Sequence, residues 1–192
     1  MTVHLAINWR AIQDALYQWV CQYTEIPWIW ANQDAPQPAY PYGVLNMPSG
    51  PTMRAPDEHR FDSIKAEMGV VGFRNFTVSL QVRVGQPAAD VSPNDDARSM
   101  LTVLQGALRL PSALSLFQAS NFCVISDPAI TQIDEKVADT WISVCGMDLV
   151  CRAASNMTET GVDYFEKLKI SSDIHGADDS LNMKDELIER EV

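Results

Sequence analysis

The chain has 192 residues, of which 46% are hydrophobic and 20% charged, a balance typical of a globular protein and not of a disordered one. Its formal net charge of −11 argues against tight nucleic-acid binding, because such binding requires clustered Lys and Arg. No apolar run approaches the ~20 residues needed to span a membrane, and Met1 to Arg10 lacks the features of a secretory signal. We therefore expect no membrane partner.

The first expected element is a helix from Asn8 to Tyr23. Its apolar residues, including Trp9 and Trp19, recur at helical spacing and form one stripe, so the helix should pack on a sheet. A short strand should follow at Trp28 to Trp30. Three Pro residues then fall between Asn32 and Pro41, and they predict a stiff, extended connector with no reactive group.

The next segment alternates between strand and loop signals. Pro41 to Met47 reads as a strand, and the loop from Pro48 to Glu58 is long, polar and interrupted by Pro and Gly. We expect this loop to project from the body, held by strands at both ends. The chain returns through His59 to Val71, and Phe76 to Val84 alternates apolar and polar residues as a half-buried strand does.

The second half begins with a helix that Ser92 caps and Pro111 ends. A long strand is expected from Trp141 to Arg152, with Trp141, Cys145 and Met147 on one face and Asp148 and Arg152 on the other face. A final strand is expected near Tyr164 to Ile170. Together these elements predict an α+β fold: a mostly antiparallel sheet of about five to seven strands, two main helices packed on one face, and the projecting hairpin loop.

No residue pattern indicates catalysis, a metal site or a cofactor. The three His are scattered without metal-ligand spacing, and no nucleophile elbow, Walker loop or dinucleotide fingerprint is present. Cys145 and Cys151 would lie ~20 Å apart on one strand, too far for a disulfide, so the thiols are expected to be reduced. We therefore expect no enzyme.

The connector and the order of elements around it resemble the neck or tail terminator proteins of tailed bacteriophages. The likeness rests on the residues Trp30-Ala31-Asn32-Gln33 and on Pro36, Pro38, Pro41 and Tyr42 leading into a strand. It continues with the hairpin, the long helix and the long strand, and it extends to about Ile170. The family usually has a charged, Arg-rich entry to the long strand, whereas this chain reads Ala138-Asp139-Thr140-Trp141.

The resemblance implies a structural virion protein of the phage neck, assembled in the host cytoplasm. Such a protein forms a ring, commonly a hexamer, that caps the tail tube and joins the tail to the head. The implied partners are other copies of the chain, the tail tube protein and a head-completion or connector protein, with DNA passing through the ring without specific binding. The alternatives are a head-completion or tail-tube protein of the same assembly, or a small-molecule-binding module with an aromatic pocket at Trp28 and Trp30.

Ring closure by a repeated head-to-tail contact needs two different surfaces on each copy. We expect residues 1–170 to form one domain that carries both surfaces. Residues 171–192 carry seven acids and two bases and are expected to be a mobile, solubilising tail. The residues expected at subunit or tail interfaces are Trp28, Trp30, Asn32, Met53, Arg54, Asp57, Glu58, His59, Arg60, Asp148 and Arg152.

Overall fold

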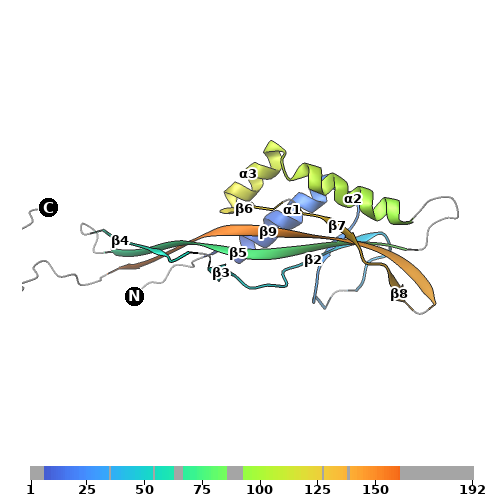
Figure 1. The fold of residues 1–192 in the computed structure, drawn as a ribbon, viewed down its shortest axis with the longest axis horizontal. Helices are drawn as coiled ribbons and strands as arrows, with labels where there is room; N and C mark the ends of the chain where they lie inside the picture. Colours follow the sequence, from blue (N-terminus) through green and yellow to red (C-terminus); the bar gives the residue numbers. More distant parts are fainter. Residues whose placement is uncertain are drawn as a thin grey trace, which may run out of the picture.

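A computed structural model describes residues 7–34, 36–53, 55–62, 67–85, 93–126, 128–137 and 139–160. Within these ranges the chain forms three helices and nine strands (Figure 1). The helices are α1 (Trp9–Tyr23), α2 (Pro93–Ala107) and α3 (Pro111–Ala119). The strands are β1 (Trp28–Trp30), β2 (Tyr42–Asn46), β3 (Thr52–Met53), β4 (Glu58–Asp62), β5 (Glu67–Val84), β6 (Phe122–Val124), β7 (Ile130–Gln132), β8 (Glu135–Val137) and β9 (Thr140–Thr160).

The sheet is built on two long strands. β5 has 18 residues and β9 has 21, and they pair antiparallel without interruption from Glu67 opposite Thr160 to Val84 opposite Ser143. β2, β3 and β4 follow one another along the free edge of β5, while β8, β7 and β6 do the same along β9. Only the β1–β2 pair is parallel among the described strands, so the expected mostly antiparallel α+β sheet is confirmed.

All three helices lie on one face of the sheet, as the sequence predicts (Figure 1). Every second residue of β5 from Phe76 to Val82 faces this helical layer, and the buried stripe of α1 belongs to the same core. Burial of these apolar side chains is the main force that holds the layers together. Side chains of this core that are less than 2% exposed include Ile12, Leu16, Trp19, Val78, Leu80, Leu101, Leu104, Phe117 and Leu149.

Beyond the helical layer, the sheet continues as an arm of three strands. The arm consists of β4, the first part of β5 and the last part of β9, and it extends to the left in Figure 1. All five residues of β4 are exposed. The first five residues of β5, from Glu67, are all half-buried and do not alternate between apolar and polar, which explains why the sequence predicted one strand only from Phe76 onward.

Some elements differ from the sequence prediction. The one or two further turns expected over Ser112 to Gln118 are a separate helix, α3, which begins at Pro111 because proline is well tolerated in the first helical turn, whereas α2 already ends at Ala107. The projecting loop is not confirmed, since Thr52 and Met53 pair with Asn75 and Arg74 and so run along the edge of β5. Gly146 lies in regular pairing with Gln81 on one side and Thr131 on the other, so β9 runs through it without a bulge. Ser92, the strand near Tyr164 and the tail from 171 lie outside the described residues.

Candidate interaction surfaces

The first candidate surface lies along the outer side of β3 and β4, and we call it the edge surface. It consists of Met53, Asp57, Glu58, His59 and Arg60, all expected from the sequence to make contacts. Met53 is 59% exposed on β3, and Glu58 to Arg60 begin β4 opposite Val71, Val70 and Gly69. The structure thus brings these residues together on one edge of the arm. Arg54, expected in the same group, lies outside the described residues.

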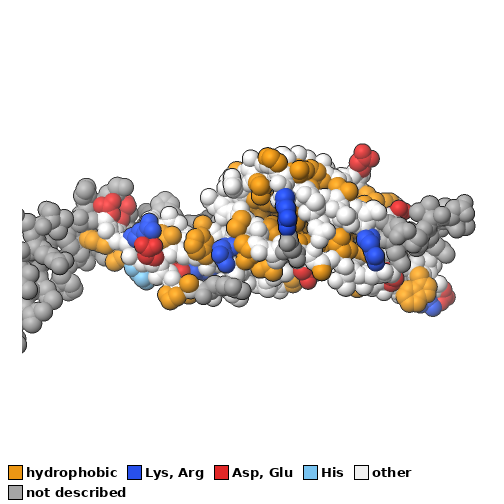
Figure 2. All heavy atoms as spheres, turned by 45° about the horizontal axis from the view of Figure 1, so that its top comes forward, with side chains coloured by type: hydrophobic (Ala, Val, Ile, Leu, Met, Phe, Trp, Pro, Cys, Tyr) orange, Lys and Arg blue, Asp and Glu red, His pale blue; other side chains and the backbone are white. Residues whose placement is uncertain are grey.

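Two charged side chains of β4, Glu58 and Arg60, are paired within the strand. Arg60 donates two hydrogen bonds to the carboxylate of Glu58, from Nε at 3.0 Å and from Nη2 at 2.9 Å. These hydrogen bonds lower the pKa of Glu58 and raise that of Arg60. Both side chains are more than 60% exposed, so solvent screening leaves this pair little effect on stability. It arranges charges at the edge of the arm, where basic, acidic and histidine side chains lie side by side (Figure 2).

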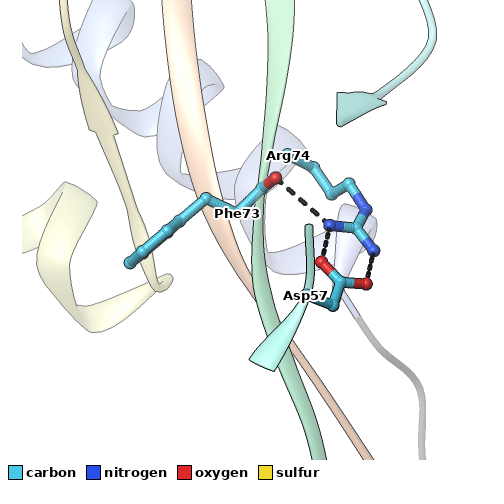
Figure 3. A network of polar contacts seen from close by, with 3 residues as sticks. All are labelled: Asp57, Phe73 and Arg74. Atoms are coloured by element: carbon cyan, nitrogen blue, oxygen red, sulfur yellow. Dashed lines mark hydrogen bonds and ion pairs between the residues drawn. The ribbon is translucent and has the colours of Figure 1, made fainter. Parts of the chain in front are cut away.

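A second ion pair fastens the segment before β4 onto the sheet. The Arg74 guanidinium donates two hydrogen bonds to the Asp57 carboxylate, at 2.6 and 2.5 Å, and a third to the carbonyl of Phe73 at 3.2 Å (Figure 3). Such a bidentate ion pair fixes the orientation of the two side chains as well as the distance between them. The carboxylate lies directly over Gly72, where a Cβ atom would come within 2.7 Å of the Asp57 Cγ. The absence of a side chain at Gly72 therefore leaves room for this ion pair between Asp57 and Arg74, which we call the clasp.

The clasp is well shielded compared with the pair on β4. The side chains of Arg74 and Asp57 are only 18% and 12% exposed. The hydrogen bonds from Arg74 lower the pKa of Asp57, although partial desolvation acts against this, and the pKa of Arg74 is raised in turn. The clasp therefore holds the start of β4 against β5 in a defined position.

The second candidate surface is the side of the sheet opposite the helices, which we call the open face. It consists of Phe73, Ser79, Asp148 and Arg152, and Asn75, which is only 7% exposed, lies next to Arg152. The Arg152 Nε donates a hydrogen bond to Asn75 Oδ1 at 3.0 Å, and its guanidinium carbon lies 5.9 Å from the centre of the Phe73 ring, within cation–π range. Phe73 itself is 58% exposed, and the Ser79 hydroxyl donates to the Asp148 carboxylate. Arg152 and Asp148 are thus ordered by neighbours on β5.

Trp28 is a core residue, which corrects the expectation that it contacts a partner. Its side chain is 3% exposed and lies across Gly43, where a Cβ atom would come within 2.5 Å of three atoms of the ring. The indole N–H donates a hydrogen bond to the Thr24 hydroxyl at 2.7 Å, and that hydroxyl donates to the Val20 carbonyl at the end of α1. The ring therefore joins α1 to β2 and offers no surface to another chain.

Trp30 and Asn32 lie closer to the surface. Trp30 is half-buried and packs against the core, and Asn32 is exposed in the turn that follows β1. Asn32 has φ of 62°, in the left-handed region that asparagine adopts more readily than most residues. The turn therefore explains why asparagine occurs at position 32. Its side-chain amide is exposed and could bind a neighbouring chain. The Trp28 ring packs directly against Gly43, so it leaves no space there for the ligand of an aromatic pocket at Trp28 and Trp30.

The four cysteines are free thiols, two exposed and two buried. Burial raises the pKa of Cys151 to about 12 and raises that of Cys145 as well, which keeps both as thiols at neutral pH. No group of three or more metal-binding side chains occurs among the described residues. No single helix in the described ranges is long and apolar enough to cross a membrane, although α2 and α3 pass the length and composition test as a pair bent by 73°.

Several residues of these surfaces escape sequence reasoning. Arg74 contacts Asp57 of the edge surface, 17 positions earlier in the chain. Phe73 contacts Arg152 of the open face, 79 positions later. No local sequence pattern indicates such distant pairs. The exposure of Trp141 also escapes the strand pattern, which predicts only that it shares one face of β9 with Cys145 and Met147. It is 65% exposed, because it lies beyond Val84, where β5 ends opposite Ser143.

An elongated sheet with a charged edge and an ordered polar face is typical of a protein that works by contact with neighbouring chains. A family model described as phage neck terminator protein matches residues 10–177. No curated protein sequence matches the chain. Since the match covers most of the chain, the protein belongs to the phage neck terminator protein family, and it is a structural protein of the phage virion.

Proposed function

We propose that the protein forms a closed ring at the phage neck, commonly a hexamer in this family, that caps the tail tube and joins the tail to the head. Each copy would contact the next through its edge surface on one side and its open face on the other. The observation that carries this proposal is that the two surfaces differ in shape and chemistry, since a repeated head-to-tail contact requires two unlike, complementary patches.

The edge surface supports such a contact through its rigidity. The clasp between Asp57 and Arg74 holds the start of β4, and all five residues of β4 are exposed along the arm. A surface that is ordered before binding loses less conformational entropy on association. Its charges, on Glu58 and Arg60, would set which partner fits and in which register.

The open face supports the contact through prepared polar groups. The Asp148 carboxylate accepts from Ser79, and Arg152 is held over Phe73, so both charged groups have fixed positions before a partner arrives. Phe73 adds an exposed ring next to a guanidinium, and aromatic and arginine side chains are enriched in interface centres. Together they form a mixed apolar and charged patch suited to a charged edge strand.

The remaining parts of the proposal follow from the family and the charge. The tail tube protein and a head-completion or connector protein would bind the two ends of the ring, which would assemble in the host cytoplasm. The net charge of −11 fits a channel that repels DNA phosphates and lets DNA pass without adhesion. Residues 1–170 would form the single domain of each copy, with 171–192 as a mobile acidic tail.

Charge reversal on the edge surface tests the ring. We expect Arg60→Glu to abolish ring formation in size-exclusion chromatography and native mass spectrometry while leaving the unfolding temperature unchanged, since Arg60 is 65% exposed. Arg10→Glu on α1 is the matched control, because Arg10 is 85% exposed and also paired with one carboxylate. Rings of wild-type size from Arg60→Glu would remove the edge surface from the proposal.

The role at the neck is tested in particles. Electron microscopy of phage that lack this gene should show filled heads separated from tails, with tail tubes that are overlong or ragged. Separated heads with tails of normal length would indicate a head-side connector instead. Intact particles of normal appearance would refute the proposed function.

A further inference from the structure

Two exposed apolar side chains, Val137 and Trp141, lie at one end of the sheet, and we call them the knob. Trp141 is 65% exposed and Val137 is 46% exposed, and both belong to the hairpin of β8 and β9, in which Trp141 pairs with Lys136. This hairpin continues past Val84, the last residue of β5 that pairs with β9. No residue of β5 therefore lies beside Trp141. An apolar patch lies at that narrow end, at the lower right of Figure 2. Tryptophan side chains are enriched at protein interfaces.

A matching hollow lies far from this knob, between α3, β6 and the end of α2. Its volume is ≈ 310 Å³, and its walls include the apolar side chains of Leu108, Leu114, Phe117, Phe122 and Val124. Leu114 and Ile125 at its rim are 44% and 41% exposed. The hollow is large enough for an indole ring, since a cavity of about 150 Å³ already holds benzene.

The knob and the hollow of one copy cannot meet. Phe122 of the hollow pairs with Ala153 on β9, twelve residues along the same strand from Trp141, which corresponds to about 40 Å. Because the two are fixed to one continuous strand, any contact between them joins two different copies. Such a contact is head-to-tail, the kind that repeats around a ring.

We propose that Trp141 of each copy inserts into the hollow of the next copy. This inference rests on the proposed ring and names a second contact within it. The charges are compatible with this pairing: Asp139 at the tip has a fully exposed carboxylate, 3.7 Å from the Lys136 ammonium of the same hairpin, and Arg109 is the charged residue among those that line the hollow. The buried ring would act as an anchor that adds to the contact of the edge surface with the open face, because one aromatic side chain in a fitted pocket can supply much of an interface's binding energy.

Cross-linking between the knob and the hollow provides the test, since Cys123 is exposed and lines the hollow. Phage particles would carry Asp139→Cys in a Cys21→Ser background and would be treated with a short bismaleimide. The two thiols of one copy are separated by more than ~35 Å of β9, so every product joins two copies. We expect a ladder of dimers and higher species, and no ladder when Cys123→Ser is added.

The possible outcomes separate this contact from the ring itself. Assembled particles that contain the ring but give no ladder would overturn the knob contact and leave the ring standing. Particles in which the wild-type protein is present in single copies would refute both. In the purified protein, Trp141→Ala should raise the concentration needed for ring assembly at least tenfold without changing the unfolding temperature. Val103→Ala is the control, because Val103 is 52% exposed on α2 and does not line the hollow.

Discussion

The contact of Trp28 with Gly43 gives the sharpest stability prediction. An alanine at position 43 would place its Cβ within 2.5 Å of three ring atoms of Trp28, whereas carbon atoms in normal contact are ~3.5–4.0 Å apart. The ring would have to move by more than about 1 Å in a site where it is 3% exposed. Overpacking of this kind costs about 1–3 kcal/mol. We therefore expect Gly43→Ala to lower the free energy of unfolding by that amount.

Gly43→Ala should instead raise the free energy of unfolding once the Trp28 ring is removed. Trp28→Ala alone should cost about 3–5 kcal/mol, as for other large buried aromatics, and it also removes the hydrogen bond to Thr24. In that background Gly43→Ala meets no ring, and alanine is favoured over glycine inside a strand by roughly 0.5–1 kcal/mol. The two substitutions should therefore be coupled by at least about 1.5 kcal/mol.

Urea denaturation of the four proteins in this cycle, followed by circular dichroism, measures the coupling. Equal slopes with shifted midpoints would show that only stability has changed. Purely additive effects would refute the stacking of Trp28 on Gly43. A Trp28→Ala variant with an unchanged midpoint would refute the core position of Trp28 and restore it as a candidate for an intermolecular contact.

Three further predictions concern the clasp and the thiols. Because hydrogen bonds from Arg74 lower the pKa of Asp57, its contribution to stability is complete above the ordinary aspartate pKa of about 3.9 and is lost as pH falls through the lower folded value. The difference between the unfolding midpoints of wild type and Asp57→Asn should therefore be constant above about pH 5 and shrink as the pH falls below about 3.9, and a difference that does not change with pH would contradict the clasp. Gly72→Ala should displace the Asp57 carboxylate and return its pKa towards the ordinary value in an NMR titration, whereas an unchanged pKa would show that the carboxylate does not lie over Gly72. Mass spectrometry after brief alkylation of the native protein at pH 8 should find two labelled cysteines, with Cys145 and Cys151 reacting only after unfolding, and a third native label would contradict their burial.

The sequence determined the parts of this protein that depend on local spacing. The stripe of α1 predicted a helix that the structure confirms to within one residue, and the short strand before the proline connector is confirmed at Trp28–Trp30. The alternation from Phe76 to Val84 predicted the second half of β5, which begins at Glu67. The reason is that burial on one face imposes a period of 3.6 on a helix and of 2 on a strand, and both periods are legible in one dimension. The family followed from the same local features, and the match over residues 10–177 confirms it.

Only the tertiary structure decided which residues meet and which remain exposed. The spacing that assigned Trp141 to one side of β9 could not reveal that β5 ends before reaching it, and the same reasoning could not separate the buried Trp28 from the half-buried Trp30. Contacts such as the clasp of Asp57 with Arg74 depend on strand register, which is set by the packing of the whole sheet. Side-chain direction is a local property of the chain, whereas burial is a property of the neighbours that folding brings together.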